Sequence, residues 1–212
     1  MIMIREMFVR KNIEKQLNTK IFGRNVYIFS EIDSTNTFAR QLAIKGAPEG
    51  TTVIADYQNN GKGRIGHEWV SDRSMNILMS LILRPGFDVE DLHIINYTTV
   101  NIVISAIQSV LIDINMTELP LYMKWPNDIM VNYKKIGGIL TESSIRNKNV
   151  EYVIVGIGLN VNQDINNFSG ELKNIATSLY HETGKKFNRE KIIIKILEQY
   201  EKVYHSIEKT IG

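Results

Sequence analysis

The feature that most restricts the fold of this chain is a nearly continuous apolar run, Asn76 to Leu83 (NILMSLIL), which ends at Arg84-Pro85-Gly86. A strand with one solvated face alternates apolar and polar residues, whereas an unbroken apolar run indicates a strand that is covered on both faces. We therefore expect this strand to lie inside a sheet that has other layers packed against it.

Four segments have the pattern of helices. Residues 6–17 form a weak amphipathic lead-in helix, and Val89 to Ile114 carries apolar residues at helical spacing, as a long central helix would. Asp33-Ser34-Thr35-Asn36 supplies cap residues for a helix that stops at Gly46. Arg189 to Ile207 closes the chain as an amphipathic helix.

The other ordered segments have the composition of strands. We expect strands at residues 25–29, 51–55, 76–83, 121–124, 129–132, 135–141 and 152–159, with a hairpin turn around 132–134. Helices and strands mix without strict βαβ alternation, so the predicted class is α+β.

The charge balance and the absence of cysteine exclude several functions. Lysine and arginine number 25 against 23 acidic residues, and a net charge of +2 is too small to indicate a nucleic-acid or membrane surface. Without cysteine there are no disulfides, thiolate nucleophiles or Cys-ligated zinc. Charges at Arg5, Glu6 and Arg10 interrupt the N-terminus before a signal core could form, and we expect no apolar run of bilayer length. We therefore expect a soluble, cytoplasmic protein.

Gly61-Lys62-Gly63-Arg64-Ile65-Gly66 satisfies the G-x-G-x-x-G pattern of dinucleotide-binding folds, but its context argues against that function. The dinucleotide motif opens a helix and needs an acidic residue about 20 positions later, whereas His67 to Ser71 leads to another apolar strand. Three glycines with two cations between them suit close approach to a phosphate or an acyl phosphate. A mobile surface loop is the alternative, which the composition alone favours.

Lys124-Trp125-Pro126-Asn127-Asp128 places a lysine at the end of a strand, close before a proline that keeps its preceding residue extended. With Met123 and Trp125 beside it, the lysine stem can lie on apolar surface while its ammonium group faces a ligand. A solvated surface lysine is the simpler interpretation.

Two more motifs leave alternatives open. Ser34 and Thr35 are explained by a helix cap, yet hydroxyl groups at a helix start also suit a polar ligand ring. Gly156-Ile157-Gly158-Leu159-Asn160 ends a strand with two glycines, which either permit close approach of a ligand or mark a bulge. The Asn160 amide is suited to contact a purine edge.

Taken in order, these motifs resemble the catalytic domain of biotin–protein ligases. The resemblance is carried by Ser34-Thr35-Asn36, Gln58, Gly61 to Gly66 with Trp69, Lys124 to Asp128, Gly137-Gly138-Ile139-Leu140, and Gly156 to Asn160. It implies a mixed β-sheet backed by helices, the class II synthetase-like fold shared with lipoate ligases. It also implies a lead-in or linker segment over residues 1–24 and a ligase catalytic domain over residues 25–212.

The activity that this resemblance implies is adenylation of biotin with ATP, followed by transfer of biotin to a lysine of an acceptor, a biotin carboxyl carrier protein. Lys124 and Arg64 are the implied catalytic residues. The Lys124 ammonium would steer the biotin carboxylate toward the α-phosphate and offset charge as pyrophosphate leaves. Mg²⁺ would accompany ATP, and the sequence does not name its ligands.

The resemblance also implies the binding residues. The biotin contacts would be Ser34, Thr35, Asn36, Gln58, Gly61, Lys62, Gly63, Arg64, Lys124 and Gly138. Among them, Ser34, Thr35 and Gln58 would bond the ureido ring, while Gly138 would let the backbone approach the valeryl arm. The ATP or adenylate contacts would be Lys62, Arg64, Trp69, Lys124, Asn127 and Asn160. Trp69 would stack on adenine, and Asn160 would hydrogen-bond it.

The chain departs from the family pattern in its loop and at its ends. The family loop usually reads Gly-Arg-Gly-Arg-Arg-Gly, whereas Lys62 and Ile65 stand at two arginine positions here. Lysine lacks the planar fork of arginine, so we expect weaker retention of the adenylate. We also expect no N-terminal helix-turn-helix domain, no small C-terminal barrel-like domain and no sequence-specific DNA binding. Sheet-edge homodimers, common in the family, are the oligomer that the resemblance suggests.

Two other functions stay open at this point. A lipoate or octanoate ligase needs similar chemistry, although Ser34, Thr35 and Gln58 favour a polar ureido ring over a dithiolane. A biotin-binding regulator without turnover would fit the altered loop and the missing C-terminal domain, whereas the presence of Lys124 and Arg64 favours an enzyme.

Overall fold

The computed structural model describes residues 8, 10–64, 66–86, 88–116, 118–168 and 170–211. Ile65, one of the two departures in the glycine loop, lies outside the described residues, as do residues 6, 7 and 9 of the expected lead-in helix. The helices are α1 (Arg10–Gln16), α2 (Thr35–Ile44), α3 (His93–Asp113), α4 (Leu172–Ile175), α5 (Leu179–Thr183) and α6 (Arg189–Ile211), with 3₁₀ turns η1 (Val89–Leu92) and η2 (Ile165–Asn167).

The strands of the described chain form one sheet. They are β1 (Val26–Phe29), β2 (Thr52–Ala55), β3 (Ile77–Leu83), β4 (Tyr122–Lys124), β5 (Asp128–Val131), β6 (Lys134–Arg146) and β7 (Asn149–Leu159). Their order across the sheet is β1-β2-β3-β7-β6-β5-β4. β1 and β2 run parallel, and every other neighbouring pair is antiparallel. The predicted α+β class with a mixed sheet is therefore confirmed.

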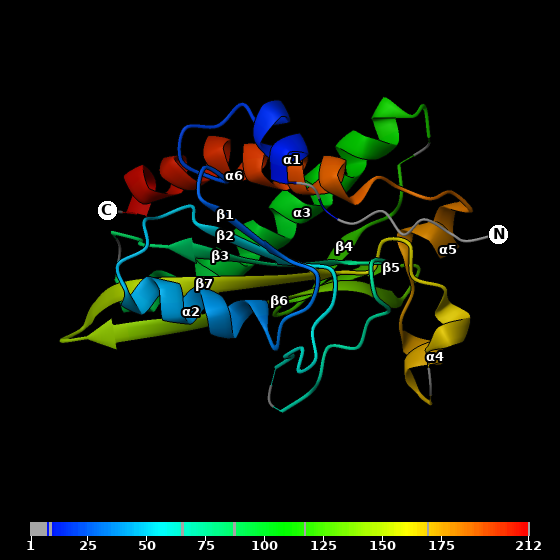
Figure 1. The fold of residues 1–212 in the computed structure, drawn as a ribbon, viewed down its shortest axis with the longest axis horizontal. Coiled ribbons are helices and arrows are strands. Elements are labelled where there is room, and N and C mark those ends of the chain that lie inside the picture. The colour runs from blue at the N-terminus through cyan, green and yellow to red at the C-terminus, as the bar shows by residue number, and fades with distance from the viewer. Residues whose placement is uncertain are drawn as a thin grey trace.

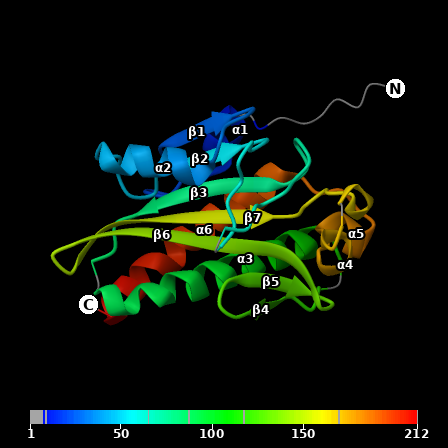
Figure 2. The same cartoon turned by 90° about the horizontal axis from the view of Figure 1, so that it is seen from below.

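Helices cover both faces of the sheet, so the molecule has three layers (Figures 1 and 2). α3 and α6 pack on one face, where Met79 and Leu81 of β3 join the larger core cluster. α2 packs on the opposite face, where Ile82 of β3 joins the smaller cluster. Every residue of β3 is buried, which confirms the strand covered on both faces that the apolar run predicts.

The segment before β1 packs into the same body. Ile13 of α1, Leu17 and Phe22 are buried in the larger core cluster. Phe22 lies with its ring centroid 5.2 Å from that of Tyr200 on α6. Burial raises the pKa of Tyr200, whose hydroxyl group hydrogen-bonds Thr99 on α3. These contacts join α1, α3 and α6 into one layer.

The long apolar helix α3 contradicts one expectation from the sequence, that no apolar run has the length of a membrane span. Val89–Asp113 is long and apolar enough to cross a membrane by length and composition, so the expectation that no run approaches bilayer length is wrong. In the fold, however, α3 packs against α6 and β6, and 56% of its most apolar window is buried. That burial is typical of the core helix of a soluble domain, whose contact surface is as apolar as a membrane span.

The structure differs from the sequence predictions in two other places, the ends of β6 and β7 and the short helices α4 and α5. β6 and β7 extend beyond the predicted 135–141 and 152–159 into a long hairpin, whose turn at Asn147 and Lys148 has positive φ. Residues 142–151 are mostly polar and largely exposed to solvent. They therefore lack the hydrophobic alternation from which a strand can be predicted. The predicted turn at 132–134 is present, with positive φ at Asn132 and Tyr133. α4 and α5 were not predicted, because each is only about one turn long.

Candidate active site

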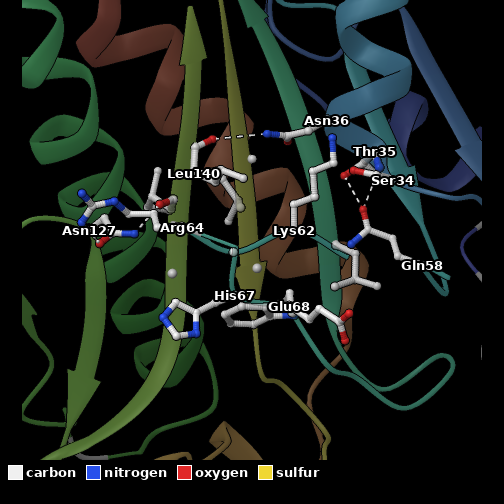
Figure 3. A pocket seen from close by; sticks show the side chains of 18 of the residues that line it. Ser34, Thr35, Asn36, Gln58, Lys62, Arg64, His67, Glu68, Asn127 and Leu140 are labelled. Atoms are coloured by element: carbon white, nitrogen blue, oxygen red, sulfur yellow. Dashed lines mark hydrogen bonds between the residues drawn. The ribbon is translucent and has the colours of Figure 1, made fainter. Parts of the chain in front are cut away.

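A cavity of about 310 Å³ lies on the face of the sheet that carries α2, beside the start of that helix. Its floor comes from β3, β6 and β7, and its rim comes from residues 58, 62–64, 67–69 and 126–128 (Figure 3). The volume is in the range of small-molecule sites. Predicted site residues that line it are Ser34, Thr35, Asn36, Gln58, Lys62, Gly63, Arg64, Trp69, Asn127 and Gly138; Gly61, Lys124 and Asn160 do not.

A polar wall closes one end of the cavity. Ser34 is the N-cap of α2, and its hydroxyl accepts from the Thr37 amide at 3.5 Å. The backbone N–H and the hydroxyl of Thr35 both donate to Oε1 of Gln58, at 2.7 and 2.8 Å. Because Oε1 already accepts two hydrogen bonds, Nε2 of Gln58 is the atom left to donate to a ligand. The cap interpretation is confirmed for Ser34. The contact of Ser34 and Thr35 with a ligand is compatible with that cap and stays a prediction.

Two residues behind this wall escaped the sequence analysis. Ser80, fully buried on β3, lies 2.8 Å from the Thr35 hydroxyl and 2.6 Å from Oδ1 of Asn36. Nδ2 of Asn36 donates to Glu142 on β6 at 2.8 Å. Ser80 is the one hydroxyl inside the NILMSLIL run, and a polar residue in such a strand was the signal that could have found it.

The backbone at Gln58 is also held from behind. Gln58 forms a parallel bridge with Ile32, and the Asn60 amide donates to the Asp33 carbonyl at 2.9 Å. Asp56, two residues earlier, is buried and forms an ion pair with buried Arg189 of α6 at 2.9 Å. The segment that carries the polar wall is thus tied both to its neighbouring loop and to the far layer.

The glycine-rich segment folds into a small hairpin over the cavity. The Trp69 amide donates to the Gly61 carbonyl at 2.9 Å, and the Gly63 amide donates to the His67 carbonyl at 2.7 Å. A Cβ atom at Gly61 would lie 2.5 Å from the Trp69 carbonyl oxygen, so the closed hairpin requires glycine there. The next element along the chain is β3, which agrees with the rejection of a dinucleotide-binding turn.

Arg64 reaches from this hairpin to the edge of the cavity formed by the 126–128 segment. Its Nη1 donates to Oδ1 of Asn127 at 3.2 Å. Asn127 is buried, and its Nδ2 and carbonyl bond the backbone of Ile139 on β6 at 2.7 and 2.9 Å. Asn127 therefore gives an otherwise exposed guanidinium a fixed partner.

The structure does not bring Lys124 to the cavity. Lys124 is exposed and pairs with Asp128, which in turn pairs with Gly138, so it lies two strands outward from the floor. Neighbouring strands are about 4.8 Å apart. Lys135, which the sequence analysis missed, lines the cavity instead, and its Nζ lies 2.6 Å from Oδ1 of Asp128.

Trp69 lies on the glycines of the floor. A Cβ atom at Gly158 would be 2.6 Å from Cε2 of the indole, and one at Gly138 would be 3.3 Å from Cζ3. Nζ of Lys135 lies 5.7 Å from the indole centroid, within cation–π range. Gly138 and Gly158 therefore make room for an aromatic wall, a role that the sequence analysis did not assign to them.

Asn160 is 4% exposed and lies behind the floor. Its Nδ2 donates to the Thr177 carbonyl at 3.0 Å, and its backbone N–H donates to the Ile136 carbonyl at 2.8 Å. Its Oδ1 is buried and has no hydrogen-bond partner among the described residues. That oxygen is the atom available for the adenine contact, which stays a prediction.

Comparison with known sequences shows the family to which the chain belongs. Residues 28–160 match the Biotin/lipoate A/B protein ligase family, so the chain belongs to that family. The bifunctional ligase/repressor BirA of Bacillus subtilis is 39% identical over 188 residues, which cover 89% of this chain and 56% of that protein. The biotin–[acetyl-CoA-carboxylase] ligase of Mycobacterium tuberculosis is 28% identical over 158 residues, covering 71% and 56%. The chain spans about half the length of these curated relatives.

Solved structures confirm the predicted fold. The biotin protein ligase from Aquifex aeolicus in complex with biotin and ATP is 30% identical, with a TM-score of 0.66 over 88% of this chain and 72% of that one. Its R40G mutant in complex with biotin gives 31% identity and a TM-score of 0.68 over the same shares. The chain thus has the class II synthetase-like fold of biotin protein ligases, as the resemblance implied.

Proposed function

We propose that this chain converts biotin and ATP into biotinyl-5'-AMP and then transfers biotin to a lysine of an acceptor protein. The observation that carries the proposal is the division of one cavity into two chemically different ends. Thr35 and Gln58 form a wall of donors and acceptors at one end, and Arg64 lies across the cavity beside Asn127 (Figure 3). Lys135, paired with Asp128, adds a second cation to the lining.

The polar wall suits the cyclic urea of biotin. A urea presents one carbonyl acceptor and two N–H donors, and the wall offers Nε2 of Gln58 as donor with the hydroxyl oxygens of Ser34 and Thr35 as acceptors. The indole of Trp69, which lies on Gly138 and Gly158, then provides an apolar surface for a hydrocarbon arm. A carboxylate at the far end of that arm would reach the cations.

In the first half-reaction, a biotin carboxylate oxygen attacks the α-phosphorus of ATP, the α–β anhydride bond breaks, and pyrophosphate leaves. Negative charge gathers at the α-phosphate in the transition state, so fixed cations there lower the barrier. We assign this task to Arg64, held by Asn127, and to Lys135, held by Asp128. We include Lys135 because it lines the cavity, whereas Lys124, for which the resemblance implied this role, does not.

In the second half-reaction, a neutral acceptor lysine attacks the acyl carbon, AMP leaves, and the amine proton passes to solvent. The mixed anhydride is already activated, so presenting it at short range in a sheltered cavity supplies most of the remaining rate. The hairpin of residues 61–69, closed by its own backbone bonds, supplies that shelter.

Magnesium enters this proposal only as the counter-ion of ATP. The described residues contain no group of three or more His, Asp or Glu side chains that could hold a metal. That fits Mg²⁺, which keeps several waters and is often bound through substrate phosphates with one or two carboxylates. Asp128 is the carboxylate beside the cavity cations that could contribute. Chelation by EDTA should stop adenylation and leave biotin binding intact.

One assay separates this function from its rivals. The chain is incubated with Mg-ATP, a biotin carboxyl carrier domain and either biotin or lipoate, and the intact mass of the acceptor is measured. Gain of one biotinyl group supports the proposal. Gain of a lipoyl group selects a lipoate ligase, the other activity named by the family, and tight biotin binding without transfer selects a regulator. A cytoplasmic location and a sheet-edge homodimer stay predictions.

A further inference from the structure

A register shift in β6 explains how Lys135 comes to face the cavity. Asp128 pairs with Gly138 and Ile129 with Gly137, but Met130 then pairs with Lys135, so Ile136 is skipped. Strand β6 therefore has one extra residue between two consecutive pairs with β5, which is a β-bulge. Bulges re-aim side chains and often lie beside active sites.

The bulge reverses the direction of Lys135. Side chains alternate along a strand, and Gly138 and Leu140 line the cavity, while a Cβ atom at Gly137 would contact Ile129 and Leu159 of the larger core cluster. Regular alternation would put Ile136 on the cavity face and Lys135 on the α3 face. Instead Ile136 is fully buried in the larger core cluster and Lys135 lines the cavity.

The bulge is held by a segment that follows β7. The Ile136 carbonyl accepts from the Asn160 amide, and the Lys135 carbonyl accepts from the Thr177 amide, both at 2.8 Å. Lys135 also forms an isolated parallel bridge with Ala176. The two carbonyls at the irregular point of the strand therefore have partners from outside the sheet.

One carboxylate ties this segment to the hairpin. Oε1 of Glu182, on α5, accepts from the hydroxyl of fully buried Thr177. Its Oε2 accepts from Nδ2 of Asn132, in the β5–β6 turn, at 2.7 Å. Glu182 therefore spans the bulge, with one oxygen on the supporting segment and the other on the turn.

We propose that Glu182 is a positioning residue for adenylation, which acts through Thr177 and Asn132 to hold the bulge that turns Lys135 into the cavity. The proposal rests on the proposed ligase function and on Lys135 as a cation of the reacting centre. Glu182 itself does not line the cavity, so its effect should appear in turnover and not in biotin affinity.

The test variant is Glu182→Gln. An amide has only one acceptor oxygen, so one of the two donors, Thr177 or Asn132, loses its partner. Misplacement of a catalytic group by an ångström can cost up to about 100-fold in rate, and we expect kcat for biotin-dependent pyrophosphate release to fall about tenfold. KM for biotin should change less than about twofold, because the polar wall is untouched.

Three companion variants make the result specific. Thr183→Val removes a hydroxyl from the same helix whose bonds stay local, to the carbonyls of Leu179 and Lys185, and it should leave kcat within about twofold. Thr177→Ser keeps the hydroxyl and should also keep kcat. In a Lys135→Ala background, Glu182→Gln should have no further effect on kcat, since residues that act through one another are not additive.

The outcomes separate the two claims. An unchanged kcat in Glu182→Gln, an equal loss in Thr183→Val, or a full tenfold loss on top of Lys135→Ala overturns the positioning role while leaving the ligase function intact. A wild-type chain that releases no pyrophosphate with biotin overturns the ligase function, and the positioning role with it.

Discussion

The two ends of the cavity are built differently. At the polar wall, Thr35, Asn36 and Ser80 are buried and hydrogen-bonded to one another or to Gln58 before any ligand arrives. At the cationic end, Arg64 is exposed on a glycine hairpin, and the side chain of Lys135 is 35% exposed. In the proposed function, the polar wall that recognises the substrate ring is thus buried and preorganised, whereas the cations assigned to the phosphate are more exposed and are held by side-chain contacts with Asn127 and Asp128.

The largest expected effect is at the cationic end. Lys135→Ala should lower kcat/KM for adenylate formation by about 100-fold or more, because a cation aimed at developing phosphate charge is lost. Lys124→Ala, the matched lysine change two strands away, should lower it less than about threefold. Single-turnover formation of biotinyl-5'-AMP measures both. A larger loss in Lys124→Ala would restore the role that the sequence suggested for that residue.

Adding one methyl group behind the polar wall should destabilise the fold. A Cβ atom at Gly156 would lie 2.3 Å from Oδ1 of Asn36, so Gly156→Ala should lower the free energy of unfolding by about 2 kcal/mol, as overpacking does. Gly86→Ala is the control, since a Cβ atom there meets nothing within 4 Å. Urea denaturation compares the two, and equal stabilities would mean that Asn36 moves freely.

Removing one hydroxyl group from the polar wall should weaken the binding of biotin. Thr35→Val removes one of the two donors to Gln58 and a partner of Ser80. Leaving buried polar groups unpaired costs about 1–3 kcal/mol, so the Kd for biotin should rise roughly tenfold, by about 1.4 kcal/mol. Calorimetric titration gives the Kd, and kcat at saturating biotin should stay nearly constant. A loss in kcat alone would place Thr35 at the chemistry and not at recognition.

The smallest expected effect is on release of the adenylate, and it follows from a change at Lys62 in the glycine-rich segment. Lys62→Arg restores a planar, bidentate donor on the exposed hairpin and should slow release of biotinyl-5'-AMP by about threefold. Stopped-flow dissociation of the adenylate measures the rate. An unchanged or faster off-rate would show that Lys62 does not hold the adenylate, whatever its position on the cavity rim.

The sequence predicted the wall better than the cationic end, for a physical reason. Ser34 and Thr35 sit at a helix cap, a local signal that depends on a few neighbouring residues. Lys135 reaches the cavity through a skipped residue, Ile136, whose register is decided by β5 and by backbone bonds from residues 160 and 177. No pattern within β6 itself records that shift, so Lys135 was missed, while the catalytic role of Lys124 stays a prediction.

The same contrast holds for the fold. The buried strand β3 and helix α2 were predicted closely, and α3 was predicted from Val89, where the structure has the 3₁₀ turn η1, because apolar period and caps mark these elements. The ends of β6 and β7 were missed because they are polar and largely exposed, and α4 and α5 were missed because each is only about one turn long. Ser80 was taken as part of an apolar strand, although its hydroxyl is fixed by residues more than forty positions away.

The packing of α3 also affects how the chain is made. The apolar surface of α3 is long enough to pass for a membrane span, and the helix that covers it, α6, follows it in the chain only after strands β4 to β7. During synthesis, α3 therefore emerges well before its covering helix exists. A nascent chain with that surface open is prone to aggregation, so the speed at which residues 189–211 are translated bears directly on the yield of folded protein.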